Sequence, residues 1–319
     1  MIRRFLFLFT TILVCFVSNE MAYSQADISM STHWFDREGY NPASIARTDY
    51  IYLFSSAREQ WTNVPGGPEV LNVHASEYIQ DLHSAFGLSL VSDNIGFTQT
   101  INPMLTYAFR ISNERDWSFS LGLSAGVFSH SIDGTLYNPV TVNDPILFYN
   151  LDKVISPDAN IGAEFQSQSF IVGLSTTHLF SIGKPDDLFL NTNQRYGYII
   201  YQNSNIDLFN YNIGLQAVNR NNLTVMEVNG LIQFKHQTGL SSGSQEIFDL
   251  GLTYRSSQQM TFLLGINISP NFRIGYAYDQ NFIPGFTQNP TNEIILEYRI
   301  PSKAATCIQC RGQESNWYH

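Results

Sequence analysis

A strict alternation of apolar and polar residues is the feature that most constrains what this chain can fold into. In the segment 271–280 every second residue is large and apolar, namely Phe272, Ile274, Tyr276 and Tyr278. The residues between them are small or polar and include Arg273 and Asp279. A period of two predicts a β-strand with two chemically different faces. Such a strand either packs its apolar face on a soluble core or, in an outer-membrane barrel, turns that face to lipid and its polar face to a lumen.

The same alternation recurs along the chain and favours the membrane alternative. In the clearest segments, the charged residues fall on the face opposite the apolar one, and that second face is rich in Gly, Ser and Thr. A soluble β-sandwich also alternates, but its outer face usually carries more Lys and Glu. Only 14% of the residues are charged, against about 25% in ordinary domains, while aromatic residues make up 14% and suit aromatic girdles. The sequence therefore predicts an all-β fold, an antiparallel outer-membrane β-barrel.

We predict about fourteen strands, an even number as in single-chain bacterial barrels. Their expected spans are 49–61, 69–78, 83–92, 97–112, 116–128, 159–167, 169–179, 194–203, 207–218, 223–236, 246–255, 259–269, 271–280 and 292–301. An even count leaves both ends of the barrel in the periplasm and makes the connections 129–158, 180–193 and 281–291 extracellular. The shorter connections near 113–115, 168, 204–206 and 270 become periplasmic turns, which is the usual asymmetry.

The chain divides into four segments in this interpretation. Residues 1–24 form a signal peptide, because Arg3 and Arg4 precede an apolar run and the small residue Ser24 suits cleavage. Residues 25–48 form an irregular segment that is either periplasmic or a plug. Residues 49–301 form the transmembrane barrel, and residues 302–319 a periplasmic tail.

Several function classes find little support. A net charge of −10 without a basic cluster argues against nucleic acid. None of the seven His has metal-ligand spacing, and no nucleophile elbow is present. We therefore predict no catalytic residue, metal or cofactor, with an outer-membrane hydrolase left as a minor alternative. Cys307 and Cys310 are expected to form a local disulfide or to remain as two thiols in the tail.

A set of charged residues falls on the predicted lumen face: Arg110, Glu164, Glu227, Lys235, Arg273, Glu293, Glu297 and Arg299. These residues either form interior salt bridges in a plugged barrel or line a charged passage. Because both signs are mixed and fourteen strands give a modest diameter, the plugged barrel is the preferred interpretation.

Short motifs follow one another along the whole chain in a fixed order. They are Asn41-Pro42-Ala43, Arg58-Glu59-Gln60-Trp61 with Gly67-Pro68 downstream, Tyr107-Ala108-Phe109-Arg110, Gly275-Tyr276-Ala277-Tyr278-Asp279, and Asn292-Glu293-Ile294. Together with Gln25 and Asp27, this ordered set resembles the PorP/SprF-like membrane proteins of the type IX secretion system of Bacteroidetes. The chain departs from the usual pattern at His33-Trp34-Phe35 and at Asn292, where His is common.

The resemblance implies an outer-membrane barrel that serves type IX secretion by recognition. Its expected partners are a secreted, adhesin-like cargo protein with a type B C-terminal domain, or the periplasmic ring components of the machine, in addition to outer-membrane lipid. We expect the extracellular loops to dock the cargo, with Tyr137, Asn138, Phe148 and Tyr149 as candidate contacts. The alternative function is a porin-like or fatty-acid-type transport channel.

Overall fold

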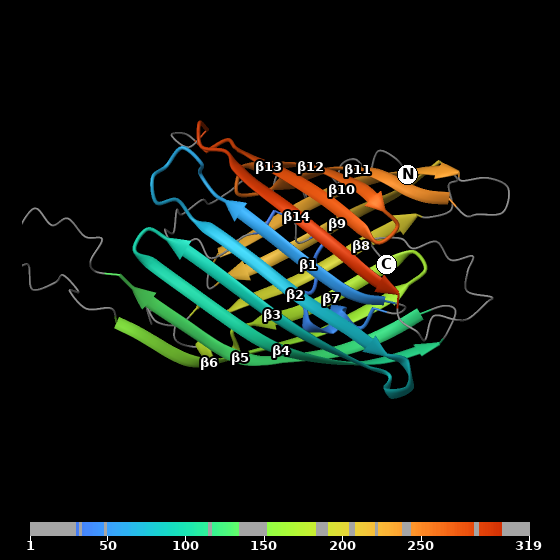
Figure 1. Cartoon of the computed structure of the whole chain (residues 1–319), viewed down its shortest axis with the longest axis horizontal. Helices are drawn as coiled ribbons and strands as arrows, with labels where there is room; N and C mark the ends of the chain where they lie inside the picture. The colour runs from blue at the N-terminus through green and yellow to red at the C-terminus, as the bar shows by residue number, and fades with distance from the viewer. Residues whose placement is uncertain are drawn as a thin grey trace, which may run out of the picture.

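The fourteen described strands form one closed antiparallel barrel (Figure 1). The computed structural model describes residues 30–31, 34–47, 50–113, 117–133, 152–182, 191–203, 208–220, 223–237, 244–283 and 287–301. Its fourteen strands are β1 Tyr50–Glu59, β2 Glu69–Ile79, β3 Ser84–Ile95, β4 Thr98–Asn113, β5 Trp117–Ile132, β6 Asp152–Ser167, β7 Phe170–Thr177, β8 Gln194–Asn203, β9 Phe209–Arg220, β10 Leu223–Gln237, β11 Ser244–Arg255, β12 Gln259–Ser269, β13 Phe272–Asn281 and β14 Thr291–Pro301. The 3-10 helices are η1 Pro42–Ile45, η2 Gln80–Leu82 and η4 Leu179–Ser181. Each strand pairs with its neighbours in the chain, and β14 closes the barrel on β1.

The predicted number of strands and most of the predicted strand boundaries are confirmed. The predicted start of the sixth strand is wrong. This strand was expected to start at residue 159, whereas β6 starts at Asp152 and lengthens the hairpin with β5. Pro157 and Asp158 lie in the part of β6 that the prediction left out. β6 pairs with β7 only from Ile161 to Gln166, so Pro157 lies where β6 has a partner on one side alone. Proline is tolerated at such an edge because no partner needs the missing N–H.

The two faces of the wall invert the pattern of a soluble protein. Large apolar residues point outward, and Leu105 is 64% exposed. Many charged residues instead point inward, and Arg273 is only 2% exposed. An apolar exterior around a polar interior is the arrangement of an outer-membrane β-barrel. In the described part of the chain, no helix combines the length and apolar character that a membrane crossing requires.

The two ends of the barrel differ in the length of their connections. We call the end that contains Tyr50 and Pro301 the proximal end, and the end with the β1–β2 hairpin the distal end. Proximal connections have two to six residues. Distal connections include two short turns at 96–97 and 221–222, but also the nineteen residues of 133–151. The predicted grouping of the long connections at one end is therefore correct.

Residues 30–31 and 34–47 lie inside the barrel, and we call them the plug (Figure 1, dark blue). Trp34, Phe35, Tyr40 and Ile45 of the plug are all buried. η1 begins with Asn41 as its N-cap and Pro42 in its first turn, two common signals for a helix start. Of the two placements predicted for the N-terminal segment, the plug is the one that the structure shows for these residues.

Candidate functional site

The plug crosses the lumen from the distal side toward the proximal end. Near the distal end, the Ser31 N–H donates to Glu293 Oε2 over 2.8 Å. Near the proximal end, Arg110 Nη1 donates to the Ala46 carbonyl over 2.7 Å, and its guanidinium lies over the Tyr78 ring. The lumen and its plug together form the candidate functional site.

A buried ionic cluster binds the distal part of the plug. Arg58 Nη1 lies 2.9 Å from Asp279 Oδ2 and 3.3 Å from Glu293 Oε2, and all three side chains are at most 1% exposed. The Ser31 hydroxyl contacts both Arg58 and Asp279. Because Arg58 and Glu293 face each other across β1 and β14, we call Ser31, Arg58, Asp279 and Glu293 the seam cluster. It stabilises the plug and the closure of the barrel together.

Charges on the β10–β14 part of the wall neutralise one another. Arg255 Nε is 2.7 Å from Glu227 Oε1, and Arg255 Nη2 also donates to the Met30 carbonyl over 2.9 Å. Arg273 bridges Asp249 at 2.6 Å and Glu297 at 2.9 Å. Buried charges are retained where such partners replace water. These pairs confirm the interpretation of the lumen charges as interior salt bridges.

On the β2–β6 part of the wall, charged groups pair with the plug instead. Arg37 Nε lies 3.1 Å from Glu164 Oε2, and both side chains are buried. His74 Nε2 lies 3.0 Å from Asp36 Oδ1. Burial raises the pKa of the Glu38 carboxyl of the plug, while the neighbouring Arg47 opposes that rise. The plug therefore supplies counter-charges to this half of the wall.

The pair of Arg37 and Glu164 gives a direct test of plug binding. We expect Arg37→Gln or Glu164→Gln alone to lower the free energy of unfolding by about 3–5 kcal/mol, because each leaves one buried charge uncompensated. The double variant should lose less than the sum of the two singles, by about 0.5–3 kcal/mol. Urea unfolding in detergent micelles measures the stability of the wild-type protein, the two single variants and the double variant, which together form a double-mutant cycle. Strictly additive losses would contradict a direct pairing.

The Asn-Pro-Ala motif occupies a notch made of two facing glycines. Gly122 of β5 and Gly162 of β6 are directly opposite in the register. A Cβ on Gly122 would overlap the backbone of Pro42, and one on Gly162 would overlap the Asn41 side chain. Asn41 Nδ2 donates to the Ala163 carbonyl over 3.2 Å and to the Tyr198 hydroxyl over 2.8 Å. Glycine inside a strand often marks such a close approach of another backbone, and here it locates the motif.

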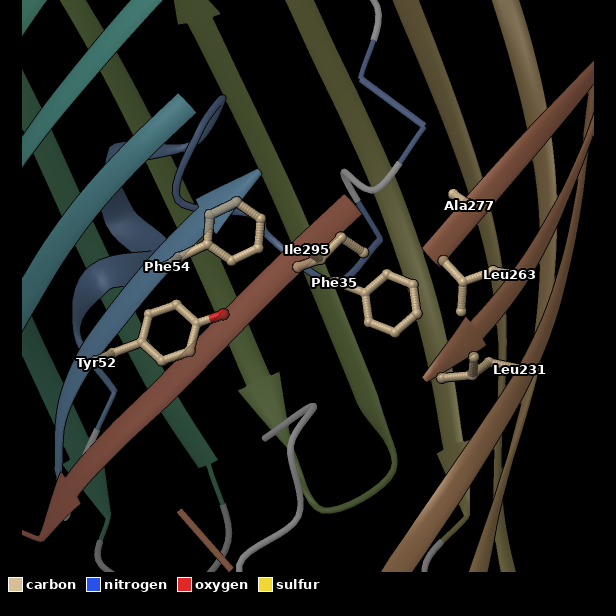
Figure 2. Close-up of a cluster of buried hydrophobic side chains, with 7 residues drawn as sticks. All are labelled: Phe35, Tyr52, Phe54, Leu231, Leu263, Ala277 and Ile295. Atoms are coloured by element: carbon tan, nitrogen blue, oxygen red, sulfur yellow. The ribbon is translucent and has the colours of Figure 1, made fainter. Parts of the chain in front are cut away.

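Two aromatic residues fix the middle of the plug. Phe35 packs in a buried cluster whose other members come from five strands of the wall (Figure 2). The members are Tyr52, Phe54, Leu231, Leu263, Ala277 and Ile295. The guanidinium of Arg273 stacks over the Phe35 ring at 4.3 Å. Trp34 lies against Gly214 of β9, where a Cβ would overlap its ring.

Very little space is left around the middle of the plug. A cavity lined by Trp34, Phe35, Arg37, Ile200, Asn212, Asn229 and Leu231 has a volume of about 10 Å³, close to the minimum that admits one water molecule. The described residues contain no group of three or more His, Cys, Asp or Glu side chains that could hold a metal ion.

The motif that begins at Arg58 builds the distal β1–β2 hairpin. The Gln60 N–H donates to the Pro68 carbonyl over 2.8 Å, and Trp61 adopts a positive φ of 58°. Gly67 has no room for a Cβ beside the Gln60 carbonyl, which lies 2.5 Å from the Cβ position. The Trp61 N–H points to the Thr291 hydroxyl at 3.4 Å. These residues hold the hairpin against the start of β14.

The remaining predicted residues fall into three groups. Tyr107, Tyr276 and Tyr278 are on the outer face, where Tyr276 donates to Asn292 Oδ1 over 2.5 Å. On the lumen side, Glu164, Glu227, Arg273, Glu293, Glu297 and Arg299 are buried, whereas Arg110 and Lys235 are partly exposed. Tyr137, Asn138, Phe148, Tyr149, Cys307 and Cys310 lie outside the described residues.

Sequence reasoning missed the residues of the wall that receive the plug. They are Asn72, His74, Gly122, Gly162, Tyr198 and Gly214. The available signal was a glycine at an inward position of two consecutive strands, in Gly122 and Gly162. That signal indicates an approaching segment but does not say which segment approaches.

A closed fourteen-stranded wall with an apolar exterior and a plugged, charged interior defines an outer-membrane β-barrel. The family model described as type IX secretion system membrane protein PorP/SprF matches residues 23–298, and the chain belongs to this family. The resemblance seen in the motifs is thereby confirmed.

The chain is also similar to solved structures at low sequence identity. The monoaromatic hydrocarbon channel CymD has 11% identity and a TM-score of 0.47, with 88% of this chain and 95% of that chain covered. A FadL homologue from Pseudomonas aeruginosa has 11% identity and a TM-score of 0.43, with 88% and 96% covered. Omp33 of Acinetobacter baumannii has 8% identity and a TM-score of 0.45, with 79% and 98% covered. No curated protein matches the chain.

Proposed function

We propose that this chain is a docking barrel that anchors a secreted cargo protein at the cell surface during type IX secretion. The observation that carries the proposal is the plug, whose buried ion pairs and aromatic contacts fill the middle of the lumen. A barrel that is solid in its centre is suited to binding at its ends. The proposed role is recognition and involves no chemical reaction.

The distal end is the proposed docking face, directed away from the cell. Long connections at one end and short turns at the other are typical of the outer and periplasmic sides of such barrels. The distal connections 60–68, 96–97 and 282–290 contain no charged residue and are rich in Asn, Gly, Pro and aromatic residues. Asn, Gly and aromatic residues also dominate antibody paratopes, where they combine adaptable hydrogen bonds with rigid contact area. A type B C-terminal domain of a cargo protein is the proposed ligand.

The proximal end is the proposed side of contact with the secretion machinery. Since residues 34–47 of the plug are largely enclosed by the wall, such a contact would use the proximal turns, such as 80–83, and the tail 302–319. Linking a surface-bound cargo to a periplasmic ring through one rigid body would fit the position of the barrel in the membrane.

The test of the docking face is a loop exchange followed by affinity capture from native outer membranes. In the variant, residues 134–150, which include Tyr137, Asn138, Phe148 and Tyr149, are replaced by a Gly-Ser linker of equal length. We expect the wild-type protein to retain a large secreted protein through its C-terminal domain and the variant to lose it. A matched control replaces the proximal residues 204–207 in the same way and should keep the cargo. Equal cargo recovery from the loop variant would overturn the assignment of the loop.

The docking function and the competing channel function predict different conductances in planar bilayers. We expect the folded protein to show no steady conductance in planar bilayers, because the plug and its ion pairs obstruct the lumen. Steady open channels in the wild-type protein would move the assignment to transport. A variant lacking residues 30–47, if it folds, serves as the positive control for an open lumen.

A further inference from the structure

Among the strands that the structure describes, β1 and β14 are the one neighbouring pair that is not consecutive in the chain, and we call their pairing the seam. Its register runs from Tyr50 opposite Pro301 to Glu59 opposite Asn292. Joining segments so far apart in the chain carries a large entropic cost, and no turn geometry fixes their alignment. Side chains must therefore specify the register of this pair.

The outer face of the seam specifies it poorly. On β1 the outward residues are Ile51, Leu53, Ser55 and Ala57, and on β14 they are Ile294, Leu296, Tyr298 and Ile300. Sliding one strand by two residues would keep all of them toward lipid, because side chains alternate with a period of two. Lipid contact therefore disfavours slips by one or three residues, which would turn apolar side chains to the lumen. It does not disfavour slips by two or four residues.

The lumen face does specify the register, and the plug contributes to it from both sides of the seam. Ser31 of the plug contacts Arg58 on β1, and its N–H donates to Glu293 on β14. A slip of two residues would move Glu293 away from Arg58 and replace it with Thr291 or Ile295. The shared hydrogen bonds of Ser31 could then not form.

Phe35 of the plug spans the same seam one step deeper in the lumen. It belongs to the same buried cluster as Tyr52 and Phe54 of β1 and Ile295 of β14 (Figure 2). These apolar residues point into the lumen from both strands of the seam, and Phe35 is the member of their cluster that the plug contributes. Apolar contacts of this kind are lost when one partner moves by a residue pair.

The opposite end of the plug is fixed on a different part of the wall. Asn41 and Pro42 fill the notch of Gly122 and Gly162, on a long hairpin of consecutive strands. The plug therefore connects a hairpin of consecutive strands with the seam that closes the barrel.

We propose that the plug is an internal splint for barrel closure, which selects the register in which β1 pairs with β14. The β5–β6 notch positions the plug, and Ser31 with Phe35 then presents matching contacts to both strands of the seam. The plug precedes β1 directly in the chain, with only residues 48–49 between Arg47 and Tyr50. The plug is therefore tethered to β1, one of the two strands whose pairing it aligns.

The test reads the register with disulfides on the lipid face of the full-length protein. In a background with Cys15→Ser, Cys307→Ser and Cys310→Ser, the pair Ala57→Cys and Ile294→Cys reports the observed register, since these residues face each other. Two further variants combine Ala57→Cys with Leu296→Cys or with Asn292→Cys and report slips of two residues in either direction. Each protein is refolded from urea into micelles, oxidised, and quantified in the detergent-stable folded fraction.

The splint is removed with Ser31→Ala and Phe35→Ala. The matched control is Ser44→Ala with Ile45→Ala, because Ile45 packs against Tyr78, Ala85 and Ala108, away from the seam. We expect the ratio of native to slipped disulfide to fall about tenfold in the Ser31/Phe35 variant, the effect of losing one coupling of ordinary strength. The control should lose stability without changing the ratio.

An unchanged ratio in the Ser31/Phe35 variant would overturn the proposal, and so would an equal fall in the control. If the double variant yields no folded fraction, Ser31→Ala alone decides. This substitution removes one hydroxyl from the seam cluster and leaves Phe35 in place. A lower native-to-slipped ratio with Ser31→Ala would support the splint, and a wild-type ratio would overturn it.

Discussion

Arg58→Gln is expected to lower the free energy of unfolding by about 3–5 kcal/mol, because it removes the cation from a buried ion pair. Asp279 and Glu293 both lie within 3.3 Å of Arg58 Nη1. Thr261 Oγ1 still donates to Asp279 in the variant, and the more distant Arg255 remains 3.9 Å away, so the compensation is incomplete. Urea titration in micelles, followed by the loss of the compact band in unheated electrophoresis, measures the change.

Two further variants separate charge from geometry at this position. Arg58→Lys keeps the charge but loses the planar fork that reaches two carboxylates, so we expect an intermediate loss. Arg195→Gln removes an exposed arginine and should change stability by less than about 0.5 kcal/mol. A loss of that small size for Arg58→Gln would mean that the seam cluster contributes nothing to stability.

Gly122→Val is expected to displace η1 from its notch and to destabilise the protein by about 3 kcal/mol, at the upper end of ordinary overpacking. The added side chain would overlap the Pro42 and Ala43 backbone, which cannot rotate away as a flexible side chain could. Displacement is measured with Ala43→Cys, whose thiol should react with a maleimide in the Gly122→Val protein and stay protected without it.

The matched control is Gly230→Val, since nothing lies within 4 Å of the Cβ position of Gly230. Both substitutions place the same β-branched residue in a strand, so differences in strand preference cancel. Protection of the Ala43→Cys thiol in the Gly122→Val protein would show that the plug does not require the notch.

Much of the wall could be predicted because the lipid fixes its outer face. Leu105, Tyr107 and Phe109 face lipid, whereas the smaller or polar residues between them face the lumen, so the two kinds alternate. The length of each alternating segment also predicts the strand ends to within a few residues. The start of β6 was predicted too late, because Pro157 breaks a strand in most contexts but is tolerated at an unpaired edge.

The interior of the site could not be predicted, since its contacts join residues with no local relation. Asn41 contacts Ala163 and Tyr198, which lie on strands more than a hundred residues away. Leu263 and Ile295 are apolar but face the lumen, where they share a buried cluster with Phe35 of the plug. A periodic pattern describes one strand at a time, whereas these contacts depend on how fourteen strands surround one segment.

The plug also gives the barrel a mechanical character that an empty tube lacks. Arg37 contacts Glu164 on one wall while Ser31 and Phe35 contact the seam strands on another, so the plug braces the cylinder from within. Close-packed interiors compress little and transmit strain. A pull on the distal loops would therefore reach the proximal rim with little flattening of the cross-section.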